Sequence, residues 1–298
     1  MEKYIKLLVI HQKRSLLWML AFIIYSCGTT PVPTPSPETD YTNCKPKVAS
    51  STFELLTWNL ENFPMHLNTT TDEVAKIIST SDVDMIAFQE VTSTTALDNL
   101  LAELPGWEGK IEISGNLNLG FLYKTSEVSI TSLTTLYDSL RSPFPRPPVV
   151  TVATHISGLT VTIIDIHLKC CGGEDNIARR VEASALLQQY IDQHLANDPV
   201  IIVGDYNDEI TTTTDPTPFQ NFIDANNDYL FADMTIAQDE NLGWSYPSWP
   251  SHIDHFLITN ELFNKVLETT TLTLEECYGN YPNVISDHRP VLLRLENK

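Results

Sequence analysis

In the segment "VIIVGDYND" (residues 200–208), four apolar residues are followed at once by a glycine and a group of oxygen-bearing side chains. An apolar run of this length is typical of a strand that is buried on both faces. Taken alone, Asp205 and Asn207 fit a turn that closes the strand, since Asp and Asn side chains bond their own backbone. The alternative is that the strand ends at a ligand site, and the rest of the chain favours this alternative.

Polar side chains also follow the other predicted strands. Neighbouring strands bring their ends to a common edge of a sheet, and this edge is where open sheets generally hold ligands. The turn interpretation would have to hold independently at six strand ends, so a shared site is the better explanation. The groups concerned, besides "GDYN", are Asn59 in "LLTWN", Glu90 in "DMIAFQE", His167 in "IIDIH", "SHIDH" (251–255) and "SDHRP" (286–290).

The chain alternates short apolar strands with amphipathic segments, which favours an α/β or α+β architecture. A hairpin is expected where Ser157 and Gly158 separate two apolar runs. Helices are predicted over residues 70–80 and 176–197, and strands over 53–60, 83–91, 149–156, 159–169, 199–207, 252–259 and 289–295.

Composition limits the class of substrate. With 298 residues, of which 42% are hydrophobic, the chain can bury a sizeable core. The formal net charge is −20, so duplex DNA would be repelled on average. A polyanionic substrate would therefore need a local positive site or a bound metal.

The N-terminal residues are expected to be an export signal. Basic residues precede the apolar run "LLWMLAFIIYSC" (16–27), which is short for a membrane span, and "IYSC" resembles a bacterial lipobox with Cys27 as the lipid attachment site. Plain secretion and a single membrane anchor remain alternatives. We therefore expect a signal peptide and lipobox over 1–27, a Pro/Thr-rich linker over 28–47, a catalytic domain over 48–298, and a location in the cell envelope.

Four further cysteines, Cys44, Cys170, Cys171 and Cys277, would lie in a compartment where disulfides persist. Adjacent Cys170 and Cys171 cannot both turn inward from one strand, so one of them could bridge to Cys44 or Cys277. Free buried thiols are an equally open alternative, and the sequence does not fix the pairing.

The polar groups make chemical sense as a unit. A hard cation such as Mg²⁺ takes oxygen ligands, which Glu90, Asn59 and Asp287 can supply. Hydrolysis of a phosphate ester needs a metal, a base for the attacking water and donors to the phosphate. His288 and His167 can serve as base and as acid or donor.

These motifs, in this order, carry a resemblance. "TWNLENF", "DMIAFQEV", "IHLK", "IVGDYND", "SHIDHFLIT" and "SDHRPV" resemble the motifs of the endonuclease/exonuclease/phosphatase superfamily, which has the deoxyribonuclease I-like fold. The resemblance runs from about residue 52 to the C-terminus. It implies an α+β fold, a four-layer α/β/β/α sandwich of two mixed β-sheets flanked by helices. It also implies a phosphoester hydrolase that uses Mg²⁺ or Mn²⁺.

The resemblance also implies roles for individual residues. Glu90 would be the principal metal ligand, with Asn59 nearby and Asp287 completing or flanking the site. His288 would be the general base, oriented by Asp254. The remaining positions would contact the phosphate: Asp205 and Asn207 would stabilise the transition state or leaving group, His167 would donate to a phosphate oxygen or protonate the leaving group, and Arg146 of "FPRPPVV" would bind the phosphate.

The sequence departs from the nuclease branch of the family at one position. A glutamate there partners the first histidine, whereas "SGNLNLGFLYK" (114–124) offers Asn116 and Asn118. Without that acid, the pKa of His167 is expected to be lower, and donation to phosphate becomes the favoured role.

The substrate is less constrained by the sequence. A nuclease-type phosphodiesterase of the envelope is our first expectation, a phosphatase or a phospholipase C/sphingomyelinase-like enzyme the alternative, and an inactive binding module the third. We expect a monomer. Arg179 and Arg180, at the start of the long helix, are candidate phosphate contacts or simply solvated charges. The aromatics Trp244, Tyr246 and Trp249 could stack on a substrate, but we favour a role in holding their loop.

Overall fold

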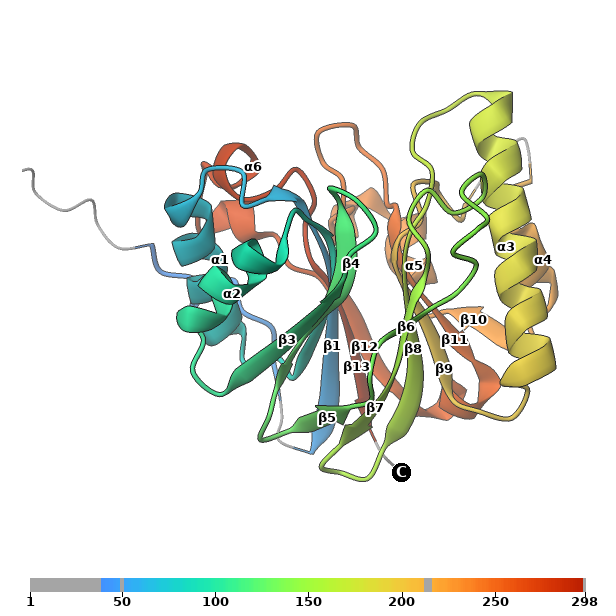
Figure 1. Ribbon diagram of the computed structural model, residues 1–298, viewed down its shortest axis with the longest axis horizontal. Coiled ribbons are helices and arrows are strands. Elements are labelled where there is room, and N and C mark those ends of the chain that lie inside the picture. The colour runs from blue at the N-terminus through green and yellow to red at the C-terminus, as the bar shows by residue number, and fades with distance from the viewer. Residues whose placement is uncertain (1–38, 49–50, 212–215, 297–298) are drawn as a thin grey trace, which may run out of the picture. The chain divides into compact units, whose positions relative to one another are not determined.

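Two β-sheets pack face to face in the computed structural model, which describes residues 39–48, 51–211 and 216–296 (Figure 1). Within these residues, the first sheet has six strands in the order β12-β13-β1-β2-β4-β3. Only β1 and β2 of this sheet run parallel, so it is mixed. The strand bounds are β1 Thr52–Phe63, β2 Met85–Val91, β3 Trp107–Glu112, β4 Asn118–Lys124, β12 Val266–Thr271 and β13 Val291–Glu296.

The second sheet has seven strands among the described residues. Six follow the order β10-β11-β9-β8-β7-β5, and β6 pairs with β7. The pair β8–β9 is parallel and the others are antiparallel, so this sheet is mixed too. The strand bounds are β5 Val128–Ile130, β6 Thr134–Thr135, β7 Val149–His155, β8 Thr160–His167, β9 Val200–Asp205, β10 Tyr229–Phe231 and β11 Asp254–Thr259.

Helices cover the outer face of each sheet (Figure 1). The helices α1 and α2 lie on the first sheet, and α3 and α4 lie on the second. This is the four-layer sandwich that the family resemblance implies. The helix bounds are α1 Asn68–Ser81, α2 Thr94–Ala102, α3 Glu174–His194, α4 Gln220–Asp224, α5 Met234–Gln238 and α6 Tyr281–Val284, with 3₁₀ turns η1 Glu240–Leu242, η2 Asn260–Lys265 and η3 Leu274–Glu276.

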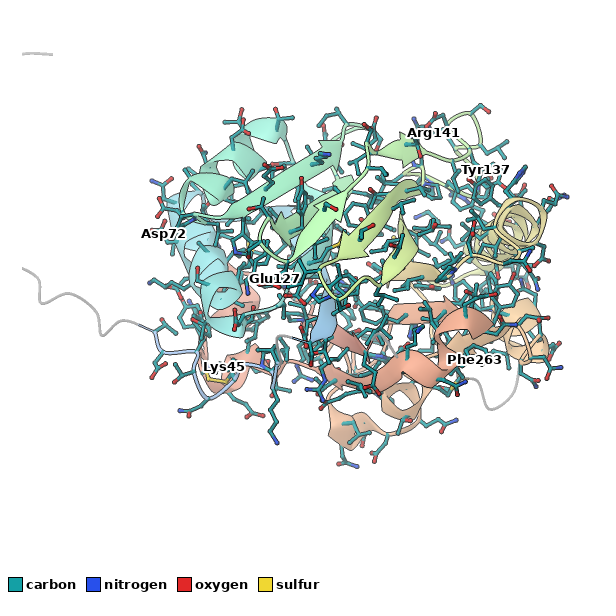
Figure 2. The ribbon with its side chains drawn as sticks, turned by 90° about the horizontal axis from the view of Figure 1, so that it is seen from below. Lys45, Asp72, Glu127, Tyr137, Arg141 and Phe263 are labelled. Carbon is teal, nitrogen blue, oxygen red and sulfur yellow. A yellow bond between two sulfur atoms is a disulfide. The ribbon has the colours of Figure 1, made fainter. Side chains whose placement is uncertain are left out.

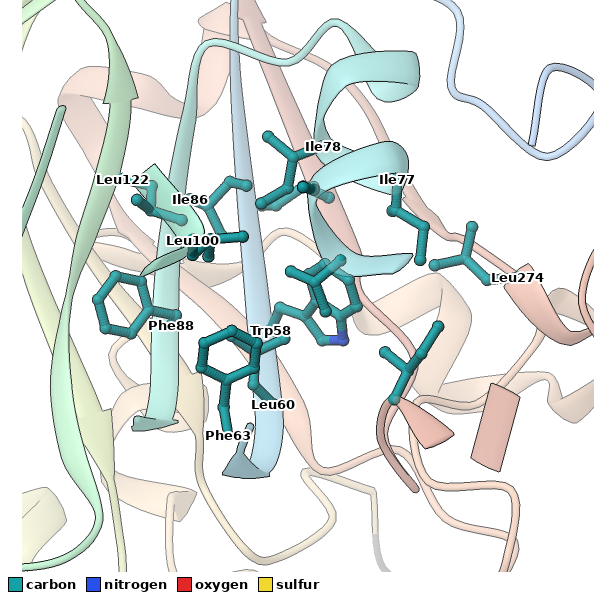
Figure 3. Packing of buried hydrophobic residues seen from close by; sticks show 14 of the residues in the cluster. Trp58, Leu60, Phe63, Ile77, Ile78, Ile86, Phe88, Leu100, Leu122 and Leu274 are labelled. Atoms are coloured by element: carbon teal, nitrogen blue, oxygen red, sulfur yellow. The ribbon is translucent and has the colours of Figure 1, made fainter. Parts of the chain in front are cut away.

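The apolar runs form strands because alternate residues enter different cores. In β1, Leu55 packs between the two sheets, whereas the next residue, Leu56, packs under the helices of the first sheet. Trp58 continues this outer row beside Ile77 of α1 and Ile86 of β2 (Figure 3). Side chains that point alternately to two buried faces explain why the strands read as continuous apolar runs.

Gly204 in β9 has no acceptable substitute. Its φ is +133°, and a Cβ atom there would lie 2.0 Å from the backbone oxygen of Ile166 on the parallel neighbour β8. We expect Gly204→Ala to lower the free energy of unfolding by about 3 kcal/mol, since both backbone strain and overlap oppose it. Urea denaturation measures this. Gly172→Ala is the control, because nothing lies within 4 Å of its added Cβ, and it should change stability by less than about 0.5 kcal/mol.

The packed part of the chain extends upstream of residue 48. Tyr41 is buried and donates a hydrogen bond to Glu73 of α1 (2.7 Å), and Cys44 forms a disulfide with Cys277 (Figure 2, beside Lys45). Part of the expected linker therefore packs against the domain. Of the two alternatives that the sequence leaves open for Cys170 and Cys171, the bridge to Cys44 or Cys277 is wrong, since both are free thiols.

The signal peptide, Cys27 and the linker up to residue 38 lie outside the described residues. None of the helices in the described ranges is both long enough and apolar enough to cross a membrane.

Candidate active site

The strand ends meet where the sequence predicts. In the second sheet, Asp205 at the end of β9 is paired in register with His167 of β8 and with Asp254 of β11. Asn59 of β1, in the first sheet, donates from Nδ2 to Asp205 Oδ2 (3.0 Å) and to Glu90 Oε1 (3.4 Å). One amide therefore links the two sheets at the centre of the site.

His288 and Asp254 form a buried hydrogen-bonded pair. His288 Nδ1 lies 2.8 Å from Asp254 Oδ2, and its Nε2 lies 3.9 Å from both Asp205 Oδ2 and Asp287 Oδ1. Burial by itself would lower the pKa of His288, but Asp254, Asp205 and Asp287 outweigh it and raise that pKa to about 10. The geometry matches a base whose Nδ1–H is held by an acid and whose Nε2 faces the site.

The loop that positions His288 is anchored to β1. Ser286 donates to the backbone oxygen of Asn59 (2.6 Å) and accepts from the His288 N–H (3.0 Å). Tyr281 donates to the backbone oxygen of His288 (2.6 Å) and accepts from Trp58 Nε1 (3.0 Å). These buried bonds explain why an aspartate and a histidine near the C-terminus reach the end of β1.

A cluster of carboxylates lies beside this pair, and it includes a residue that our sequence analysis missed. Glu61 accepts from the Asp287 N–H (2.8 Å), and burial, Asp287 and Glu90 raise the pKa of Glu61 to about 7. Glu90 Oε2 accepts from the Asn62 N–H (3.0 Å). Glu61 could have been found in "WNLEN", because it lies two residues after Asn59 and residues two apart on a strand share a face.

These acids fit a divalent cation. Glu61, Glu90 and Asp287 are like charges drawn together, and oxygen donors of this kind suit Mg²⁺ or Mn²⁺. Asp205, Asp254 and His288 also have potential ligand atoms within 4.8 Å of one another. Asn59, by contrast, directs its amide nitrogen at the carboxylates, because its oxygen accepts from the Glu61 N–H (3.0 Å). In this arrangement Asn59 acts as a donor to the acids.

His167 is held as a neutral side chain. Its Nε2 lies 3.3 Å from Asp205 Oδ2 and 3.8 Å from Glu90 Oε1, while its buried Nδ1 has no partner among the described residues. Burial, Arg146 and His288 hold the pKa of His167 well below its usual range. Asn118 does not orient the ring, since its amide binds the backbone of Val91, Ser114 and Gly115. The direction of the shift in the pKa of His167 agrees with the expectation, but its largest cause is burial.

Several residues at the site have an unusual backbone conformation. Glu90 (φ +66°) and Asn207 (φ +54°) both adopt the left-handed region that L-residues rarely use, and so do Glu61 and Asn62. The Asn207 N–H donates to Asp205 Oδ1 (2.8 Å), and Asn207 Nδ2 donates to the backbone oxygen of Leu168 (3.3 Å). Such conformations persist where surrounding contacts enforce them, and they are commonest at functional sites.

The structure distinguishes the three candidate arginines. Arg146 faces the site: burial lowers its pKa, and the nearby carboxylates of Glu90 and Asp205 act in the opposite direction. It also lines a hollow of about 210 Å³ with residues 114–117 and Pro145. No hydrogen bond or ion pair to Arg146 occurs within the described ranges, so its guanidinium is available to an anion.

Arg179 and Arg180 bind other groups of the protein, which corrects the expectation that they bind phosphate. Arg179 donates from Nε to the backbone oxygen of Ser142 (2.6 Å). The buried Arg180 forms an ion pair with Asp208 (2.7 Å) and donates to the backbone oxygens of Lys169 (2.7 Å) and Cys171 (3.0 Å). Arg180 therefore fixes the loops that follow β8 and β9.

Of the three aromatics, one touches the site. The Tyr246 ring lies over His288 with 4.8 Å between ring centroids, and burial and Asp287 raise the pKa of Tyr246. Trp244 donates to the backbone oxygen of Ile236 (3.0 Å) and so holds its loop, as we favoured. Trp249 is 78% exposed.

A second network of histidines and a carboxylate is buried next to Asp254. Asp233 Oδ2 lies 2.6 Å from His255 Nδ1 and 2.9 Å from His252 Nε2. His252 Nδ1 accepts from the Ser245 N–H (3.2 Å), whereas His255 Nε2 faces the backbone oxygen of Asp208 (3.1 Å). These partners require His252 to be neutral and His255 to carry two protons.

The pKa shifts agree with this assignment. Burial lowers the pKa of His252. Burial would also lower that of His255, but Asp233 outweighs it and raises it. Burial would raise the pKa of Asp233, but the two histidines outweigh it and hold that pKa well below its usual range. A charged His255–Asp233 pair is therefore buried next to Asp254.

We expect Asp233→Asn to destabilise the protein by about 3–5 kcal/mol, because it leaves His255 without its counter-charge. The stabilisation that Asp233 contributes is fully present above its pKa in the unfolded state, near 3.9. It is lost as the pH falls through the lowered pKa of Asp233 in the folded state. The stabilisation that His255 contributes is fully present below its pKa in the unfolded state, near 6.5. It is lost as the pH rises through the raised pKa of His255 in the folded state. The difference in the free energy of unfolding between wild type and variant should thus be largest between about pH 4 and 6.5. Chemical denaturation at pH 5.5 and 8.5 measures it, and a larger loss at pH 8.5 would refute the assignment.

Comparison with known proteins agrees with this geometry. The family model described as "Endonuclease/Exonuclease/phosphatase family" matches residues 56–288, and the chain belongs to this family. No curated protein matches the sequence.

Solved structures share the fold at low identity. D. rerio TDP2 complexed with single strand DNA product is 12% identical, with 83% of this chain and 100% of that chain covered and a TM-score of 0.67. A Bacteroides thetaiotaomicron mannosyl-6-phosphatase is 17% identical, with 82% and 100% covered and a TM-score of 0.59. The human nocturnin catalytic domain with bound sulfate is 17% identical, with 83% and 93% covered and a TM-score of 0.63. At these identities the likeness shows the deoxyribonuclease I-like fold.

Proposed function

We propose that this chain is a divalent-metal-dependent phosphoester hydrolase. The observation that supports this most strongly is the His288–Asp254 pair, whose Nε2 faces Asp205 beside the acids Glu61, Glu90 and Asp287. A base held by an acid, next to a concentration of oxygen ligands, is the arrangement that hydrolysis of a phosphate ester needs. Membership of the family supports the same reaction class.

Glu61, Glu90 and Asp287 would hold the cation, with Asn59 orienting Glu90 and Asp205. A bound divalent cation would supply positive charge that neutralises phosphate oxygens and offsets the carboxylates that raise the pKa of His288.

The residues around the cation site have separate tasks. His288 Nε2 takes the proton of the attacking water, while Asp254 holds its Nδ1–H. His167, kept neutral, donates from Nε2 to a phosphate oxygen. Burial and Asp254 raise the pKa of Asp205 to about 7, so near neutral pH it can donate a proton toward the leaving group. Arg146 binds the phosphate from the side of the 114–117 loop.

Two substrate classes fit this site. A nuclease-type phosphodiesterase is the reading that the sequence motifs favour. The structure supports the second candidate, a phosphatase or phospholipase C-like enzyme for a small or lipid phosphate. Arg179 and Arg180 are bound to the protein, the net charge is −20, and a polyanionic strand gains affinity from several cationic contacts.

Assaying the full-length protein with Mg²⁺ on single-stranded DNA, RNA, sphingomyelin, a sugar phosphate and a generic phosphodiester separates these classes. Preferred turnover of the sugar phosphate or sphingomyelin would support the second candidate, and preferred turnover of a polynucleotide the first. Absence of turnover on every substrate, with bound metal verified, would contradict the proposed reaction.

We further propose that the protein is exported and lipid-anchored in the cell envelope through Cys27, and that it acts as a monomer. The Cys44–Cys277 disulfide supports an oxidising compartment. Labelling of cells with radioactive palmitate should mark the wild type and not Cys27→Ala. Equal labelling of both would refute the anchor.

A further inference from the structure

A second group of potential metal ligands lies at the opposite end of the sandwich. Asp84 directly precedes β2, Glu127 directly precedes β5, and His155 ends β7. One ligand atom from each lies within 4.8 Å of the others, and His155 Nε2 is 3.7 Å from Asp84 Oδ2. Figure 2 views the molecule from this end, with Glu127 near the centre. Asp84 belongs to the first sheet and His155 and Glu127 to the second, so the group spans the seam between the sheets.

The buried His155 ring has a nitrogen without a hydrogen-bond partner among the described residues, which indicates a missing ligand. Its exposed fraction is 2%, yet its Nε2 has no hydrogen-bond partner among the described residues. Its Nδ1 lies 2.9 Å from Ser157 Oγ and can donate its proton there, which frees the Nε2 lone pair as in metal-bound histidines. In the competing arrangement, the Ser157 N–H donates to Nδ1 (3.2 Å). The Nε2 proton then faces Asp84 Oδ2 at 3.7 Å, beyond hydrogen-bond distance.

A further carboxyl group lies beside this cluster. Glu54 and Asp84 are both buried, and the Glu54 N–H donates to Asp84 Oδ2 (2.9 Å), which brings a second carboxyl group next to the cluster. Lys124, three residues before Glu127, is paired with Asp82 instead.

We propose that Asp84, Glu127 and His155 bind a structural divalent transition metal, of which Zn²⁺ fits best. Imidazole nitrogen and carboxylate oxygen are both ligands that Zn²⁺ accepts, whereas Mg²⁺ prefers oxygen ligands alone. An ion held by both sheets would tie together the end of the sandwich that lies away from the catalytic residues. This proposal does not depend on the proposed hydrolysis.

The test is Zn²⁺ binding by the full-length protein in excess Mg²⁺, measured by equilibrium dialysis and by thermal unfolding. The variants His155→Gln and Glu127→Gln should each lose one equivalent of Zn²⁺ relative to wild type. Glu127 is only half-buried, so its variant preserves the test if His155→Gln fails to fold. The exposed His66→Gln, remote from the cluster, is the matched control and should keep the wild-type stoichiometry.

At a hundredfold excess of Zn²⁺ over its dissociation constant, the melting temperature of the wild type should rise by about 5–10 °C. The same addition should leave Glu127→Gln nearly unchanged. Equal stoichiometry and equal thermal shifts in wild type and both variants, or no Zn²⁺ bound by the wild type, would overturn the proposal.

Discussion

Replacing His288 with alanine is expected to lower kcat by about a thousandfold, the typical contribution of a positioned base. His288 Nε2 faces Asp205 at 3.9 Å, and its Nδ1 is held by Asp254 at 2.8 Å, so the attacking water loses its proton acceptor when the ring is removed. Steady-state hydrolysis of a generic phosphodiester by the Mg²⁺-loaded protein measures the loss.

The Asp254 partnership provides the control for that prediction. Asp254→Asn should cause a comparable loss, and the double variant should be little worse than His288→Ala, because residues that act as a unit are non-additive. Both variants should keep the cooperative unfolding of the wild type. Losses that multiply in the double variant would mean that Asp254 and His288 act separately.

Glu90→Gln is expected to cause the second large effect, a fall in turnover of about a thousandfold at limiting Mg²⁺. The substitution preserves shape and keeps an oxygen for the Asn62 N–H, but it removes a negative charge from the acids Glu61, Glu90 and Asp287. Several kcal/mol of transition-state stabilisation by the metal would be lost with it. A titration of activity against Mg²⁺ concentration measures both the rate and the apparent affinity.

A measurement of stability distinguishes the loss of a metal ligand in Glu90→Gln from unfolding of the variant. Because the three acids repel one another, Glu90→Gln should leave the metal-free protein as stable as wild type or more so. Glu112→Gln, on the edge strand β3, is the matched control and should change neither rate nor Mg²⁺ dependence. An unchanged Mg²⁺ titration in Glu90→Gln would show that Glu90 is not a ligand.

Much of the fold could be predicted because apolar runs and polar strand ends are local signals. The strands that carry Asn59, Glu90, His167 and Asp205 form as expected, and so do the hairpin β7–β8 and the long helix α3. These side chains then meet because parallel and antiparallel pairing fixes their register. The short strands β6 and β10 are too brief to give a periodic pattern.

Other features depend on contacts between distant residues, which the sequence does not display. The left-handed backbone of Glu90 and Asn207 is imposed by tertiary packing. Arg180 looks like a solvent-facing residue at a helix start, yet Asp208 and two carbonyl groups bury it. The Cys44–Cys277 bridge joins residues 233 positions apart, and no spacing rule selects that pairing.

The most direct test of the proposed active site is a crystal of the protein soaked in Mn²⁺, with the anomalous scattering of the ion used to locate it. We predict a peak in contact with the carboxylates of Glu90 and at least one of Glu61 and Asp287, and its loss in Glu90→Gln. A protein that hydrolyses phosphoesters with no Mn²⁺ at these acids, or with the ion unaffected by the substitution, would contradict the proposed active site.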